Sequence, residues 1–248
     1  MKYKVISIML ICLFQIGAVQ AGTLEDLREK LRSNNVEKVK NKNKSKNKIV
    51  KSEVKDIFIV TCFNGKHSYA ISLPPGYSES NRYPVLFCFD PGGDGLEAVK
   101  MFKYASEKYD WIVVGSLDAK NGPWAPILRA QKVMLRDVKQ KYNVDNKKFY
   151  AAGFSGGARM AYTIAYGNPQ YFKAIIACGS GFGRGNIRKK IAVYHCVGDE
   201  DFNLEEVKKT YNKLKNRKVK TKLNEFSGDH RWPPTYVRNE AVDWIASL

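Results

Sequence analysis

Short runs of apolar residues alternate with longer amphipathic stretches along most of this chain of 248 residues. The short runs are apolar throughout, which is typical of strands that are buried on both faces of a sheet. The longer stretches repeat their apolar residues with the period of a helix. This alternation predicts an α/β fold, in which helices cover both faces of a mainly parallel sheet.

The expected elements begin at residue 57 and continue to the end of the chain. A hairpin opens the series, because Asn64-Gly65 is a strong turn signal between two strand-like runs. Strands are expected at 57–63, 68–73, 85–89, 111–115, 148–153, 173–178, 191–197 and 220–226. Helices are expected at 95–109, 125–142, 156–166, 204–214 and 235–247.

Residues 1–21 have the composition of a secretory signal peptide. Lysines precede an apolar run over 5–16, and small residues follow at Ala18 and Ala21, where a signal peptidase cuts. The run is shorter than the ~18 apolar residues that a membrane-spanning helix needs, so an uncleaved anchor is the weaker alternative. We therefore expect a secreted or periplasmic protein.

Residues 22–55 differ in composition from the rest of the chain. Asn41–Lys48 reads NKNKSKNK and has no apolar residue, so it cannot bury enough surface to offset the entropy lost on ordering. The segment is predicted to be a basic and largely disordered linker, and residues 56–248 a single catalytic domain. A weak contact of this linker with a membrane or the cell wall is an open alternative.

The chain carries a formal net charge of +18. A strongly basic protein can bind nucleic acid, anionic lipid or polyanionic wall polymers. No nucleic-acid-binding motif accompanies the charge, so nucleic acid is not expected as a partner. A solvated basic surface is the simpler interpretation.

Four cysteines lie beyond the signal segment, and each falls within an apolar, strand-like run. They are Cys62, Cys88, Cys178 and Cys196. An oxidising compartment would permit disulfides, but positions inside buried strands favour free thiols. None has the spacing of a Cys/His metal site, so neither a metal nor another cofactor is expected.

One motif suggests a nucleophile. Residues 153–157 read GFSGG, which matches G-x-S-x-G between an expected strand and an expected helix. So tight a turn leaves no room for flanking side chains, and the N-terminus of the helix offers N–H groups to developing negative charge. Ser155 is therefore the candidate nucleophile, and an ordinary glycine-rich loop is the alternative.

A serine nucleophile needs a base, and the chain has three histidines. His67 lies beside the hairpin turn, far upstream of Ser155. His195 lies inside a strand-like run, where a core histidine with satisfied hydrogen bonds is the simpler interpretation. His230 lies in the loop between the last strand and the last helix, where a parallel sheet presents its ligands. His230 is therefore the expected base.

The histidine in turn needs a carboxylate that orients it. The strand at 191–197 is followed by Gly-Asp-Glu-Asp, so three carboxylates compete. Asp201 fits best, as the acid of a G-x-x-D turn. Asp199 is the main rival and Glu200 the weaker one, each with a turn or helix-capping role as its alternative. The expected order along the chain is Ser155, then Asp201, then His230.

An oxyanion formed at Ser155 needs two N–H donors. The Gly156 backbone is one. The second is expected in the loop that follows the strand at 85–89, where Pro91 has no N–H to give. Gly92 is the first choice and Gly93 the second.

These motifs together resemble the α/β-hydrolase superfamily from about residue 67 to the end. Within it, the chain looks like single-domain esterases around the poly(3-hydroxybutyrate) depolymerases, feruloyl esterases and dienelactone hydrolases. The segments that carry the resemblance are 73–77, 83–84, 90–95, 153–157, 198–201 and 228–232. Dienelactone hydrolases use a cysteine nucleophile, whereas Ser155 stands here, so that chemistry is not implied. The resemblance implies an eight-stranded sheet and no cofactor.

The expected function is a serine hydrolase that cleaves small-molecule or polymer-attached carboxylic esters through an acyl-enzyme. Trp124 and Trp232 follow strands at the same sheet edge, and either line an acyl or aryl pocket or anchor their loops. A serine peptidase of the prolyl-oligopeptidase type is one alternative. A non-catalytic relative that binds anionic polymer or lipid is another.

Overall fold

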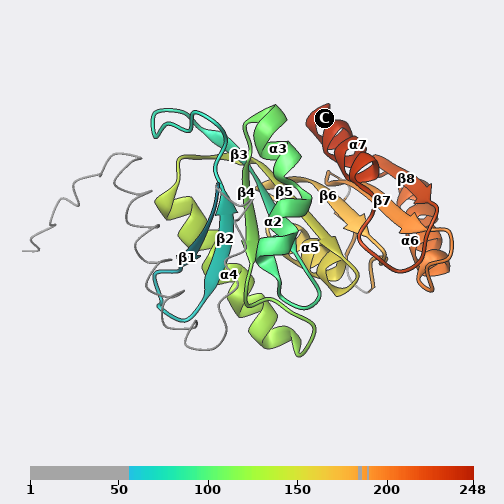
Figure 1. Ribbon diagram of the computed structural model, residues 1–248. Coiled ribbons are helices and arrows are strands. Elements are labelled where there is room, and N and C mark those ends of the chain that lie inside the picture. The colour runs from blue at the N-terminus through green and yellow to red at the C-terminus, as the bar shows by residue number, and fades with distance from the viewer. Residues whose placement is uncertain (1–55, 184–185, 189) are drawn as a thin grey trace, which may run out of the picture.

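The computed structural model describes residues 56–183, 186–188 and 190–248. In this part of the chain, one eight-stranded sheet has the order β1-β2-β4-β3-β5-β6-β7-β8, with β1 toward the left of Figure 1 and β8 toward the right. The strands are β1 Ile57–Thr61, β2 Ser68–Ser72, β3 Tyr83–Phe89, β4 Ile112–Ser116, β5 Val144–Phe154, β6 Phe172–Cys178, β7 Ala192–Gly198 and β8 Thr221–Phe226. The helices are α2 Gly95–Met101, α3 Lys103–Tyr109, α4 Trp124–Lys141, α5 Gly156–Gly167, α6 Leu204–Asn216 and α7 Thr235–Ala246.

The sheet is antiparallel at one end and parallel over the rest. β2 pairs antiparallel with β1 and with β4, whereas each later neighbouring pair is parallel. The carboxyl ends of β3 to β8 therefore meet at one edge of the sheet, where parallel α/β sheets place their sites. The expected α/β-hydrolase fold, with eight strands in a mainly parallel sheet, is confirmed.

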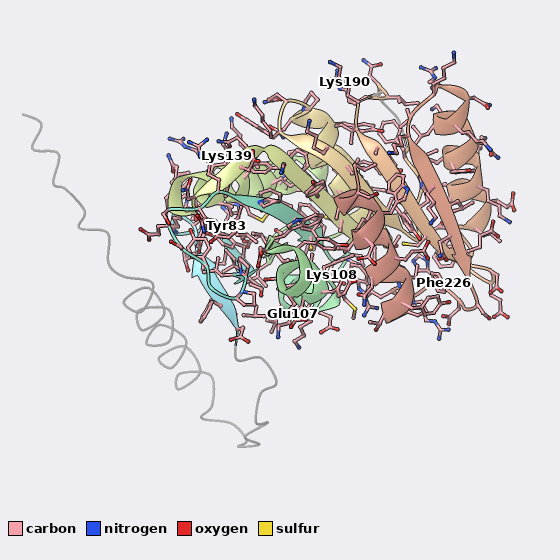
Figure 2. The ribbon with its side chains drawn as sticks, turned by 90° about the horizontal axis from the view of Figure 1, so that it is seen from above. Tyr83, Glu107, Lys108, Lys139, Lys190 and Phe226 are labelled. Atoms are coloured by element: carbon pink, nitrogen blue, oxygen red, sulfur yellow. The ribbon has the colours of Figure 1, made fainter. Side chains whose placement is uncertain are left out.

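Helices cover both faces of the sheet. One apolar cluster joins a face to α4, α5 and α6, and a second joins the opposite face to α2, α3 and α7. Successive side chains of a strand point to opposite faces, so in β3 Phe87 lies in the first cluster and Cys88 in the second. Figure 2 shows the two layers from above, with Lys139 of α4 and Lys108 of α3 on opposite sides of the sheet.

The helix expected at 95–109 is two helices. Phe102, between α2 and α3, leaves helical geometry (φ −117°, ψ 17°). Its ring is fully buried and lies 6.0 Å from the ring of Trp232. The break between the two helices coincides with the packing of this ring against the loop after β8. The helical period of the sequence does not indicate it.

The cysteines of the described residues are buried free thiols, as the strand positions predicted. Burial raises the pKa of Cys62 to about 12 and holds the pKa of Cys88 and of Cys196 well above the usual value. Cys178 and Cys196 face each other across β6 and β7 with their sulfur atoms 3.0 Å apart. The thiols of Cys62, Cys88 and Cys196 are therefore protonated and unreactive at neutral pH.

The predicted signal segment and linker, residues 1–55, lie outside the described residues. Among the helices of the described part, none is both long and apolar enough to cross a membrane.

Candidate active site

Ser155 stands at the turn between β5 and α5. Its backbone has φ 53° and ψ −120°, a conformation that is costly for any residue with a side chain and is typical of a nucleophile elbow. A methyl group added at Gly153 would overlap the backbone of Gly157, and one added at Gly157 would overlap the carbonyl of Phe89. The two outer glycines of the motif therefore allow the close approach that turns Ser155 outward.

The structure brings Ser155, His230 and Asp201 together in one chain of contacts. His230 Nε2 lies 2.9 Å from Ser155 Oγ. On the other side of the ring, Nδ1 lies 2.8 Å from Asp201 Oδ2 and 2.9 Å from Oδ1. Because a carboxylate only accepts, Nδ1 carries the proton and Nε2 is free to accept the proton of the serine hydroxyl.

Burial distinguishes the acid from the base. The Asp201 side chain is 1% exposed and that of His230 is 19% exposed. Asp201 Oδ1 also accepts the backbone N–H of Asn203 at 2.7 Å, which fixes the orientation of the carboxylate. The acid is thus held away from water while the imidazole faces the open edge of the site.

The two rival carboxylates have other positions. Asp199 is exposed, and its Oδ1 accepts the backbone N–H of Gly228 at 2.9 Å, so it ties the turn after β7 to the loop after β8. Glu200 is exposed as well. Of the three carboxylates in this turn, Asp201 is the one in contact with His230.

Two phenylalanine rings enclose the imidazole of His230. The ring of Phe154 lies 4.7 Å away and that of Phe202 lies 4.1 Å away, each measured between ring centroids. Phe202 is 78% exposed although it is a large apolar residue. Sequence reasoning missed Phe202. The sequence did contain an indication of its role, because Phe202 is an aromatic residue in a polar turn and directly follows the expected acid.

The expected oxyanion donors differ in availability. Gly156 is the first residue of α5, so its N–H has no partner within the helix. The N–H of Gly92, however, donates to Asp90 Oδ1 at 2.7 Å, and the N–H of Gly93 donates to the Asp90 carbonyl at 3.1 Å. Either glycine would become an oxyanion donor only after losing that bond.

The two tryptophans have different surroundings. Trp232 is partly buried, donates from Nε1 to Asp90 Oδ2 at 3.3 Å, and packs 5.4 Å from the ring of Phe154. Its contacts fit the anchoring alternative. Trp124, the first residue of α4, is 47% exposed and remains a candidate substrate contact.

The remaining histidines lie outside this constellation. His67 contacts Asn64 within the β1–β2 turn. His195 is fully buried in β7, as expected, but the expectation of satisfied hydrogen bonds was wrong, because neither ring nitrogen has a partner among the described residues. Burial lowers its pKa to about 3, so the ring is neutral at physiological pH.

Comparison with known families places this site in context. Residues 110–232 match the dienelactone hydrolase family, and this segment includes Ser155, Asp201 and His230. No sequence among the curated proteins matches the chain.

Solved structures with the same fold include several esterases. A thermostable esterase superposes with a TM-score of 0.62 at 18% identity over 77% of this chain, which spans 62% of the length of that esterase. A feruloyl esterase module from Clostridium thermocellum in complex with sinapinate gives 0.60 at 16% identity, covering 76% of this chain and 86% of that one. An esterase from Pyrobaculum calidifontis gives 0.61 at 15% identity, covering 92% and 90%.

Proposed function

Because the chain has the α/β-hydrolase fold and matches the dienelactone hydrolase family, we propose that it is a serine hydrolase that cleaves carboxylic esters through an acyl-enzyme. The match and the esterase neighbours support an ester-cleaving enzyme. The observation that carries the serine mechanism is the continuous contact from Asp201 through His230 to Ser155. This arrangement is the one that activates a serine hydroxyl in unrelated hydrolase folds.

In the proposed mechanism, His230 Nε2 takes the proton of Ser155 Oγ as that oxygen bonds to the ester carbonyl carbon. The electron pair of the carbonyl bond moves to its oxygen, where the N–H of Gly156 donates to it. Asp201 keeps the proton on Nδ1 and stabilises the imidazolium. When the intermediate collapses, the bond to the alcohol breaks and the alcohol takes the proton from His230. Water then hydrolyses the acyl-enzyme by the same steps.

The proposed substrates are small-molecule or polymer-attached esters. Two large exposed side chains lie near the carboxyl edge of the sheet and offer apolar surface to an acyl group: Trp124 at the start of α4 and Phe202 in the turn after β7. A related feruloyl esterase module holds sinapinate, so aromatic acyl esters belong in the first set of substrates to compare with short-chain acyl esters.

We propose in addition that the protein is exported and that residues 22–55 are a basic linker. The support is the composition of the first 55 residues. Edman sequencing of the mature protein from its native host is expected to begin after Ala21. A mature protein that retains Met1 would contradict export by a cleaved signal.

Hydrolysis of p-nitrophenyl acetate tests the proposed function. The Ser155→Ala variant is expected to lose turnover, because no other described side chain lies where the nucleophile must stand relative to His230. Ser80→Ala, which changes an exposed serine in a remote loop, is the matched control and is expected to keep wild-type turnover. Wild-type turnover in Ser155→Ala would contradict the assignment of Ser155 as the nucleophile.

Rates on matched ester and peptide substrates separate the esterase from the peptidase alternative. With an acetyl ester and the corresponding anilide, the esterase proposal predicts turnover of the ester alone. Equal turnover of the anilide would favour a peptidase.

A further inference from the structure

Among the described residues, the proposed mechanism lacks a free second backbone N–H donor for the oxyanion at Ser155. An oxyanion at Ser155 is held by two N–H donors in serine hydrolases, and Gly156 supplies only one. The loop after β3 would supply the other, but Pro91 has no N–H and the N–H of Gly92 is already donated to Asp90.

Asn121 lies where this second donor is missing. It belongs to the loop between β4 and α4, and its backbone N–H donates to the Pro91 carbonyl at 2.8 Å. Its side chain reaches Gly156: a methyl group added at Gly156 would overlap Asn121 Oδ1 and would lie 3.1 Å from Nδ2. The amide of Asn121 therefore occupies the space that a side chain directly after the nucleophile would fill.

The side-chain amide of Asn121 can supply the missing N–H donor. An asparagine side chain has two N–H donors on a freely rotating terminal torsion, and rotation by half a turn exchanges Oδ1 and Nδ2. Among the described residues, no hydrogen bond is made by the side-chain amide of Asn121, and the residue is exposed at the open edge of the site. Nδ2–H is thus available to a ligand beside Gly156.

We propose that Asn121 is a catalytic residue, whose Nδ2–H is the second oxyanion donor of the serine hydrolase proposed above. As Ser155 Oγ bonds to the carbonyl carbon and its proton passes to His230, the carbonyl electron pair collects on the oxygen. Gly156 N–H and Asn121 Nδ2–H donate to that oxygen. The bond from Asn121 N–H to Pro91 positions the side chain in place of the backbone donor that Pro91 lacks.

The first test replaces the amide. Asn121→Ala is expected to lower kcat by about 100- to 1000-fold, the usual cost of one oxyanion donor, while KM changes less than about threefold. Asn121→Asp keeps the shape but replaces the donor by a negative charge, so its kcat is expected to fall at least as far. Lys120→Ala, the neighbouring residue on the same loop, is the control and is expected to keep wild-type kcat.

The second test uses the contact with Gly156. Gly156→Ala puts a methyl group where the Asn121 amide lies, so the amide must move and kcat is expected to fall as in Asn121→Ala. In Asn121→Ala the space is empty, so adding Gly156→Ala is expected to cost little more. The two losses are therefore expected to be strongly non-additive.

A transition-state analogue separates catalysis from structure. A trifluoromethyl ketone that adds to Ser155 is expected to lose affinity for Asn121→Ala in proportion to the loss of kcat/KM, with the melting temperature unchanged. A wild-type enzyme that is active, with full kcat and full analogue affinity in Asn121→Ala, would overturn the role of Asn121 alone. A wild-type protein that neither turns over esters nor binds the analogue would overturn the proposed function, and this inference with it.

Discussion

Asp201 and Asp199 are two residues apart in one turn, yet they face different partners. Asp201 is buried against His230, and Asp199 is exposed against the backbone of Gly228. A spacing of two residues could not decide between them in the sequence, since both follow β7 at the same sheet edge. The direction in which the turn presents each side chain determines which aspartate contacts His230.

This difference predicts unequal effects of the same substitution. Asp201→Asn is expected to lower kcat by on the order of 10⁴-fold, because an amide in place of the carboxylate favours the wrong tautomer of His230. Asp199→Asn keeps an oxygen for the N–H of Gly228 and is expected to keep most of the activity. Steady-state rates of the two variants give the comparison. A larger loss in Asp199→Asn would reassign the acid.

His195 makes the stability depend on pH. Its pKa is about 3 in the folded protein because of burial, and about 6.5 in the unfolded chain, so acid protonates the unfolded state first. The stabilisation is complete above pH 6.5 and is lost as the pH falls toward 3. Between pH 7 and pH 5, the wild type is expected to lose about 2 kcal/mol more unfolding free energy than His195→Leu.

Urea unfolding of both proteins at each pH measures this difference. Parallel losses in the wild type and in His195→Leu would mean that His195 is accessible to protons in the folded state.

At the scale of elements, the strands and the elbow could be predicted because each depends on local pattern. Continuous apolar runs identified the strands, and the glycines around Ser155 identified the turn between β5 and α5. The break between α2 and α3 could not be predicted, since the helical period runs through Phe102 and the break coincides with packing against Trp232. The place of Asn121 likewise depends on a contact between two loops, and the donation from Gly92 to Asp90 depends on the conformation within the loop after β3.

Phe102 is also expected to matter for stability. Phe102→Ala leaves a cavity between α2, α3 and the loop after β8, and is expected to cost about 3 to 5 kcal/mol of unfolding free energy. Phe202→Ala removes the same side chain from an exposed position and is expected to cost less than about 0.5 kcal/mol. Denaturant unfolding compares the two, and equal costs would contradict the role assigned to Phe102.

For the whole molecule, the sheet explains why distant residues meet. Ser155, Asp201 and His230 follow β5, β7 and β8, which are parallel and end at one edge (Figure 1). The loops after β3 and β4 bring Pro91 and Asn121 to the same edge. The candidate site is thus built from five loops on a rigid sheet, with the nucleophile at its centre.

The residue that an active-site probe modifies tests the role of Ser155 as nucleophile most directly. After incubation with a fluorophosphonate, peptide mapping by mass spectrometry is expected to place the phosphonyl group on Ser155 and nowhere else. The Ser155→Ala and His230→Ala variants are expected to remain unlabelled. Labelling of another serine, or a wild-type protein that does not react, would contradict the assignment of Ser155 as the nucleophile of a serine hydrolase.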